Sequence, residues 1–173
     1  MKTSSFSSLS LWVLPGLTAG AVFLAVALLV SAFTTTVWAV PDSIAQAIGM
    51  AAPAGYGFAL VPVVVGVAVH LAFSIGLGAI FTALAQRLQL HGWLLVAAAV
   101  TFIGIETPIT LWGVLYHLLP ATTFQHFLHA LLFWGSFLGR MMYGLTLGLF
   151  LDRLWKPQQY FTSQAAIEKR DAG

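Results

Sequence analysis

The sequence has no cysteine and very few charged residues. Without cysteine, the chain forms no disulfide, no thiolate metal site and no cysteine nucleophile. Charged residues make up 7% of the chain, against roughly 25% in an ordinary soluble domain. Because so few charges cannot cover a water-exposed surface, we expect lipid to surround most of the protein. The small net charge of +2 and the lack of any run of lysine and arginine argue against nucleic-acid binding.

Long apolar stretches take the place of the missing charges, since 60% of the residues are hydrophobic. A membrane-spanning helix needs about 20 mostly apolar residues, and four segments meet this requirement. They are continuously apolar and lack the alternation of β-barrel strands, so we predict an all-α membrane protein with a four-transmembrane-helix bundle. The expected helices cover about 11–40, 58–84, 93–119 and 127–151. They form one domain over residues 1–156, followed by a polar cytoplasmic tail over 157–173.

The basic residues predict how the bundle is oriented. With four crossings, one side receives Lys2, Arg87, Arg153, Lys156, Lys169 and Arg170. Lysine and arginine gather on the cytoplasmic side of membrane proteins, so both termini are expected there. The first apolar run is longer than the core of a signal peptide, which spans about 7–15 residues, so we expect it to remain as a helix. The expected location is a bacterial inner membrane.

The second and fourth predicted helices share a pattern at an offset of 70 residues. Small residues recur at intervals of four, and each row contains one basic or titratable residue. The rows are Gly66, His70, Ser74 and Gly78, and Ser136, Arg140, Gly144 and Gly148. The pattern suggests two repeated helical hairpins. Small residues let helices approach closely in lipid, either within the bundle or against a second copy or another subunit. The expected packing glycines are Gly66, Gly78, Gly135, Gly139, Gly144 and Gly148.

Three ionisable residues, His70, Glu106 and Arg140, lie well inside the apolar segments at similar predicted depths. An unpaired charge at the bilayer centre costs at least ~2.5–3.5 kcal/mol, which favours an ion pair between Glu106 and Arg140. The cluster is either a substrate, proton or ion site, or a static pair that fixes helix register. Pro108 is expected to kink the third helix beside it. The remaining hydrogen bonds are assigned to Ser74, Thr107, Thr110 and Tyr143.

Three histidines, His117, His126 and His129, are predicted near the outer membrane surface. Imidazoles in such a group can bind Zn or Cu, and a pair on two helices can ligate haem b. Histidine is also an ordinary residue of the membrane interface. Both interpretations stay open at this point.

No catalytic motif occurs in the chain, and we do not expect an enzyme. The leading hypothesis is a small non-enzymatic inner-membrane protein that assembles with itself or serves as an accessory subunit of a larger membrane complex. The second hypothesis is a small transporter or a proton or ion pathway through the His, Glu and Arg cluster. The third is an electron-transfer subunit that binds haem or a metal through the outer histidines.

Overall fold

The computed structural model describes residues 8–51, 57–110, 116–118 and 134–171, and this part of the chain is helical with no β-strand. The helices are connected by short turns wherever the connections are described. In chain order they are α1 (Ser8–Thr34), α2 (Ala39–Ala47), α3 (Leu60–Arg87), α4 (Gly92–Pro108), α5 (Tyr116–Leu118) and α7 (Trp134–Asp171).

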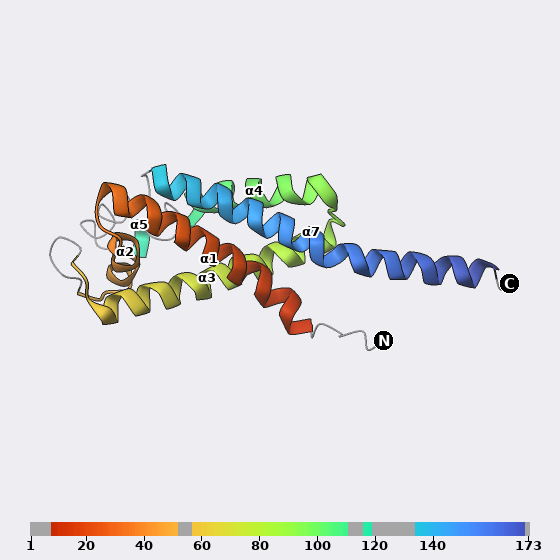
Figure 1. Ribbon diagram of the computed structural model, residues 1–173, viewed down its shortest axis with the longest axis horizontal. Coiled ribbons are helices and arrows are strands. Elements are labelled where there is room, and N and C mark those ends of the chain that lie inside the picture. Colours follow the sequence, from red (N-terminus) through yellow and green to blue (C-terminus); the bar gives the residue numbers. More distant parts are fainter. Residues whose placement is uncertain (1–7, 52–56, 111–115, 119–133, 172–173) are drawn as a thin grey trace.

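The four long helices run alternately up and down, so both termini lie at the same end of the bundle (Figure 1). Helix α1 packs along α3 on one side and along α7 on the other, and α4 packs along α7. Helices α3 and α4 touch only sparsely, partly through the rings of Phe81 and Phe102. The short helix α2 lies against α3 at the end opposite the termini. Helix α7 continues beyond the bundle to Asp171.

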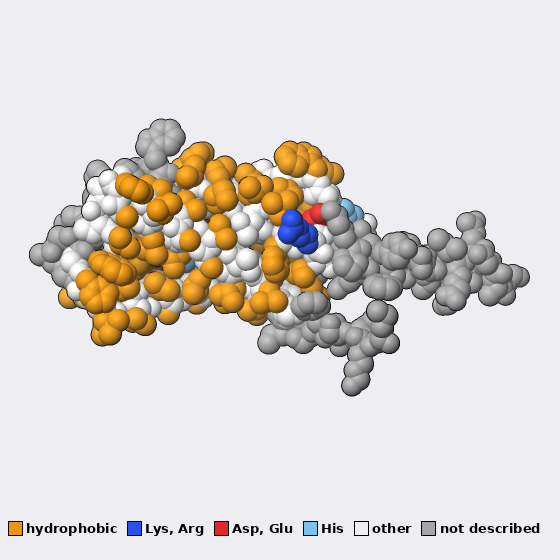
Figure 2. Space-filling view, viewed as in Figure 1, with side chains coloured by type: hydrophobic (Ala, Val, Ile, Leu, Met, Phe, Trp, Pro, Cys, Tyr) orange, Lys and Arg blue, Asp and Glu red, His pale blue; other side chains and the backbone are white. Residues whose placement is uncertain are grey.

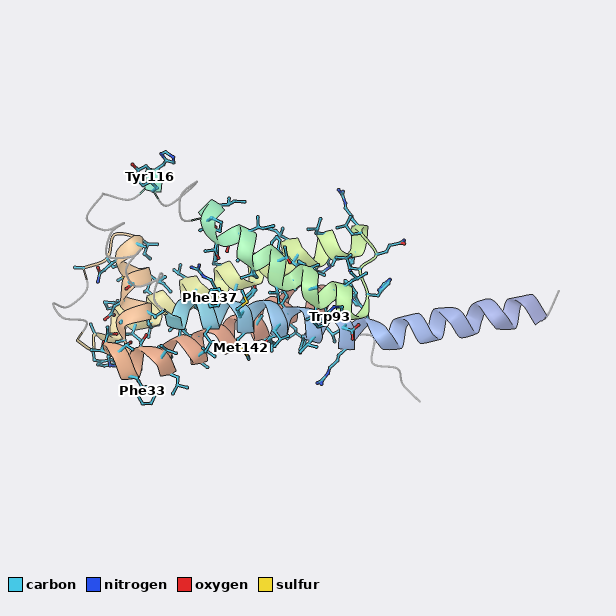
Figure 3. The ribbon with its side chains drawn as sticks, turned by 90° about the horizontal axis from the view of Figure 1, so that it is seen from above. Phe33, Trp93, Tyr116, Phe137 and Met142 are labelled. Atoms are coloured by element: carbon cyan, nitrogen blue, oxygen red, sulfur yellow. The ribbon has the colours of Figure 1, made fainter. Side chains whose placement is uncertain are left out.

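The outer surface of these helices is apolar. Phe33 is 83% exposed, Trp93 78% and Leu60 64%, and the side chain of Phe33 points away from the helices in Figure 3. Apolar side chains cover most of the face shown in Figure 2, and charged side chains gather near the end where the termini lie. Only 33% of the most apolar stretch of α1 and 22% of that of α3 is buried. Among the described residues, α1 and α3 are long and apolar enough to cross a membrane, and α4 is a shorter apolar helix.

Glycine allows the helices to approach backbone to backbone. A Cβ atom added to Gly16 would lie 2.8 Å from the Cα of Ile75, and one added to Gly78 would lie 2.7 Å from the backbone nitrogen of Gly16. Ordinary carbon contacts are about 3.5–4.0 Å, so neither position has room for a side chain. Helices α1 and α3 therefore meet at a crossing that only glycine permits.

The pair α4 and α7 repeats this arrangement. A Cβ atom on Gly144 would lie 2.8 Å from the Cα of Val100, and one on Gly148 would lie 2.6 Å from the Cα of Val96. Gly148 follows Gly78 by 70 residues, as the sequence pattern predicts, and each of these glycines faces the preceding long helix. The second helix of each hairpin thus uses the same face against the first.

The other predicted packing glycines have different neighbours. Gly66 meets the backbone of Pro41 in α2, and a Cβ atom on Gly139 would lie 3.1 Å from the ring of Phe23. Gly135 belongs to α7, but its surroundings lie outside the described residues. The interpretation of the sequence missed Gly16 and Gly20 in α1, although their spacing of four residues was available as a signal.

The first predicted helix, 11–40, is wrong at its end. Helix α1 stops at Thr34, and the separate helix α2 begins at Ala39. The threonine run that starts at Thr34 has low helix propensity, and the hydroxyl of Thr34 bonds back to the carbonyl of Val30 at 3.0 Å. Pro41 sits in the first turn of α2, where its missing N–H is not needed.

The remaining boundaries agree with the sequence in part. Helix α3 lies within three residues of the predicted 58–84 at both ends. Of the predicted helix 93–119, α4 is regular to Pro108, and Ile109 and Thr110 follow in a wider π-helical turn. Proline has no N–H to continue the ladder, which explains the change at the predicted kink.

The fourth predicted helix, 127–151, also ends elsewhere. Residues 127–133 lie outside the described residues, and α7 runs past residue 151 to Asp171. The tail expected over 157–173 is therefore helical through most of its length. Its glutamine, alanine, glutamate, lysine and arginine residues are strong helix formers, and this outweighs its polar character.

Candidate functional site

Several buried and half-buried polar residues of the bundle form a row, which we call the polar row: His70 and Ser74 of α3, Tyr143 and Arg140 of α7, and Glu106 of α4. It begins where α3 crosses α1. His70 Nε2 lies 3.1 Å from the carbonyl oxygen of Gly20, and the imidazole ring stacks on Phe23 with centroids 4.9 Å apart. A carbonyl oxygen only accepts, so Nε2 carries the proton of this bond.

Ser74 and Tyr143 continue the row from α3 to α7. The hydroxyl of Ser74 lies 3.5 Å from His70 Nε2, one helical turn away. The phenol of Tyr143 is buried and donates a 2.7 Å hydrogen bond to the backbone carbonyl of Ser74. The small Gly20 opposite leaves space for Ser74, because a side chain there would collide with its hydroxyl. The close α1–α3 crossing therefore positions the polar atoms.

Glu106 and Arg140 lie at the far end of the row. The carboxylate of Glu106 accepts a hydrogen bond from the hydroxyl of Thr110, and it interacts electrostatically with both Arg140 and Tyr143. No direct ion pair joins Glu106 and Arg140 within the described part of the chain. The expected short-range pair is thus replaced by a longer-range attraction and a local hydroxyl bond. The hydroxyl of Thr107 bonds to the carbonyl of Ile103 on its own helix at 2.9 Å.

The structure brings together most of the residues predicted for the buried cluster, but through backbone atoms as much as through side chains. The polar row touches four different helices, and it offers an imidazole, two hydroxyls, a carboxylate and a guanidinium in sequence. Groups of this kind can hold an ion or pass a proton where hydrogen bonds connect them. They can equally fix the rotation of one helix against the next, as buried polar groups do in other proteins.

At the end of the bundle near the termini, Asp152 connects α7 to the start of α4. Its carboxylate accepts a 3.1 Å hydrogen bond from the backbone N–H of Gly92, which begins α4. Next to it, the ring of His91 packs edge-on against Trp155 with centroids 6.5 Å apart. Arg87 and Arg153 are exposed at this same end. We call it the basic end of the bundle.

The outer histidines are only partly described. His117 is exposed in α5, and its ring packs edge-on against Tyr116 at 5.3 Å. His126 and His129 lie outside the described residues. Within the described ranges, no three His, Asp or Glu side chains are grouped to hold a metal ion. The structure therefore describes one of the three residues predicted to bind haem or a metal.

Asp42 is a buried polar residue that lies between the first two helices predicted from the sequence. It lies in the first turn of α2 with no solvent exposure, and neither carboxylate oxygen has a hydrogen-bond partner. Burial raises the pKa of this carboxyl group. The sequence did carry a signal, because Asp42 is the one charged residue between Lys2 and Arg87.

Comparisons of this chain with protein-family models, with curated proteins and with solved structures find no match.

Proposed function

We propose that this chain is a four-span protein of a bacterial inner membrane, and that it works as a non-enzymatic subunit that assembles with itself or with a larger membrane complex. One observation carries the proposal: the helices are packed backbone to backbone inside while their outer faces expose large apolar side chains. Lipid is the solvent that tolerates such an outer surface.

Four crossings are supported by the composition of the helices beyond α1 and α3. The apolar sequence of α4 continues from residue 109 to residue 119, and α7 contains a single charged residue, Arg140, before Asp152. The basic end carries Arg87 and Arg153 together with both termini, which by the charge rule is the cytoplasmic side. The opposite end carries α2.

Labelling of single cysteines tests this topology, and the natural chain contributes no background cysteine. Gln86→Cys lies at the basic end of α3 and Ala51→Cys follows α2, and both positions are exposed. On intact cells, a membrane-impermeant maleimide should label Ala51→Cys, whereas Gln86→Cys should react only after the membrane is opened. Labelling of both positions from the same side would refute the four-span arrangement.

Assembly with another helix is supported by the outward face of α3. Ala68, Ala72 and Gly76 follow one another at intervals of four, all three are exposed, and a Cβ atom on Gly76 would meet nothing within 4 Å. Inside the bundle, the same spacing on the other side of α3 accommodates a close helix crossing. The outward face is therefore shaped for a second close contact in lipid.

Cysteine cross-linking in the membrane tests the assembly. Under mild oxidation, Ala72→Cys should form a disulfide-linked dimer, or a cross-link to another subunit carrying a cysteine. The control is Leu149→Cys, an exposed position on α7 without small neighbours at this spacing. Equal cross-linking of the two variants, or a monomer by native mass spectrometry in gentle detergent, would contradict the assembly.

The polar row supports a second candidate function, a proton or ion pathway. The specific observation is that polar groups of α3 and α7 follow one another closely. The Ser74 hydroxyl lies 3.5 Å from His70 Nε2, and Tyr143 donates its hydroxyl to the backbone carbonyl of Ser74. The carboxylate of Glu106 acts electrostatically on the phenol of Tyr143. Proton flux into liposomes that contain the purified protein and a pH-sensitive dye measures this activity directly. Removal of the phenol hydroxyl in Tyr143→Phe should abolish the flux. Liposomes that stay as tight as protein-free controls would rule out the pathway and leave the assembly proposal standing.

A further inference from the structure

The carboxyl group of Asp42 is buried without a partner at the end of the bundle opposite the termini. Its side chain is 0% exposed, and no donor lies within hydrogen-bond distance of either oxygen. Helix α2, which carries Asp42, lies at the outer end of the long helices, against α3. The group is therefore desolvated yet close to the surface of the molecule.

The elements packed against α2 supply no positive charge to this carboxyl group. Helix α2 contacts α3 and, less extensively, α1. The described part of α1 has no ionisable side chain, and the nearest titratable residue of α3 along the chain is His70, one helical turn beyond Gly66. The proton on His70 Nε2 is already donated to Gly20. Ser43, the next residue, donates its hydroxyl to the carbonyl of Ala39 at 2.7 Å and not to Asp42.

The position of α2 leaves little freedom to relieve this burial. The carbonyl group of Pro41 lies against Gly66, so closely that no side chain fits between the two backbones. Asp42 follows directly in the same turn, and its backbone N–H is bonded to the carbonyl of Trp38 at 3.0 Å. The helix is thus held against α3, and the backbone at Asp42 is fixed within the first turn of α2.

An ionised carboxylate in this position is disfavoured, because no hydrogen bond or positive charge replaces its lost hydration. The neutral acid avoids most of this penalty. We propose that Asp42 is a proton-binding site at the α2 end of the bundle, where its carboxyl group takes up a proton from the adjacent solution and holds it as the neutral acid. The inference goes beyond the proposed function, since neither the assembly face nor the polar row includes Asp42.

Dicyclohexylcarbodiimide is a suitable probe, because it reacts with protonated carboxyl groups in apolar surroundings. The carboxyl oxygen bonds to the central carbon of the carbodiimide while the proton moves to one nitrogen. The acyl group then shifts from oxygen to the other nitrogen. The product is an N-acylurea that contains the whole reagent, and nothing is released. Peptide mass spectrometry of the full-length protein in detergent locates and quantifies this adduct.

We expect an adduct at Asp42 that forms more slowly as the pH rises, and no adduct at this position in Asp42→Asn. Asp152 is the matched control, because it is bonded to the N–H of Gly92 at the basic end and should react much less. The infrared difference between the natural protein and Asp42→Asn at neutral pH should also contain the carbonyl band of a protonated acid. This band reports the proton even if the reagent does not reach the site.

The proposal would be overturned if the infrared band is absent and the reagent shows no preference for Asp42 over Asp152. Loss of the Asp42 adduct on addition of sodium or potassium chloride at constant pH would also overturn it, because a metal cation would then be the ligand. Circular dichroism and elution volume of Asp42→Asn should match those of the natural protein. This test uses no assembly or flux readout, so its failure would leave the proposed function untouched.

Discussion

The close crossing of α1 and α3 makes a sharp prediction for Gly78→Ala. The new methyl group would point at the backbone of α1, 2.7 Å from the nitrogen of Gly16. Since ordinary contacts begin near 3.5 Å, the two helices would have to separate by about 1 Å. Both sides of the contact are backbone, so no flexible side chain can move out of the way. Overpacking of this kind typically costs ~1–3 kcal/mol.

Gly104→Ala is the matched control, at an exposed glycine of helix α4. Its methyl group would meet nothing within 4 Å, so it should show only the helix-propensity gain of about 0.5–1 kcal/mol. Both variants share that gain, and the difference between them isolates the collision. We expect Gly78→Ala to be less stable than Gly104→Ala by ~1–3 kcal/mol in a reversible unfolding titration with dodecyl sulfate in mixed micelles, followed by circular dichroism. Equal stabilities would show that α1 and α3 do not cross at these glycines.

Three further predictions concern the buried polar groups. Tyr143→Phe removes the 2.7 Å bond to α3 and should lower the unfolding free energy by about 0.6–1.5 kcal/mol in the same titration, and an unchanged free energy would show that this bond does not form. In a double-mutant cycle of Glu106→Gln and Arg140→Gln, the coupling should be favourable but smaller than for a direct ion pair; strictly additive effects would show that the two do not interact. Burial raises the pKa of Asp42, so between its ordinary and its raised pKa the folded chain binds more protons than the unfolded chain, and stability should fall as the pH rises through that window. Asp42→Asn should lack this fall in stability. If the stability of Asp42→Asn changes with pH as steeply as that of the natural protein, the raised pKa of Asp42 is wrong.

Helix α3 and its packed face follow from the sequence because small residues at intervals of four occupy one side of a helix. The structure extends this row to Thr82, which is buried and donates its hydroxyl to the carbonyl of Gly78 at 2.7 Å. The break after α1 was missed because the apolar residues Val37–Val40 resume after the threonine run, although the run Thr34–Thr36 was available as a signal. Helix α2 contacts α3 where Pro41 meets Gly66. The sequence does not indicate this contact, because the two residues lie far apart in the chain.

The partners of the residues in the polar row could not be predicted from their depth in the membrane alone. Counting residues indicates that His70, Glu106 and Arg140 lie at similar levels, but it says nothing of the rotation of each helix. His70 and Tyr143 donate their hydrogen bonds to backbone carbonyls. The positions of these carbonyls depend on how closely α1, α3 and α7 approach one another. Residue type alone therefore suggests an ion pair, whereas the described contacts are hydrogen bonds to the backbone and a longer-range attraction.

The central claim is that the apolar outer faces of the long helices contact lipid. Nitroxide spin labels on single cysteines at Leu29, Ile80, Ile105 and Leu149 sample α1, α3, α4 and α7 in reconstituted vesicles, and Gln86 provides a water-exposed reference. Collision rates with oxygen, which dissolves in lipid, and with a polar nickel chelate, which does not, distinguish the two environments. The account predicts frequent oxygen collisions and rare nickel collisions at all four apolar positions, with the reverse at Gln86. Nickel collisions at the apolar positions as frequent as those at Gln86 would contradict it.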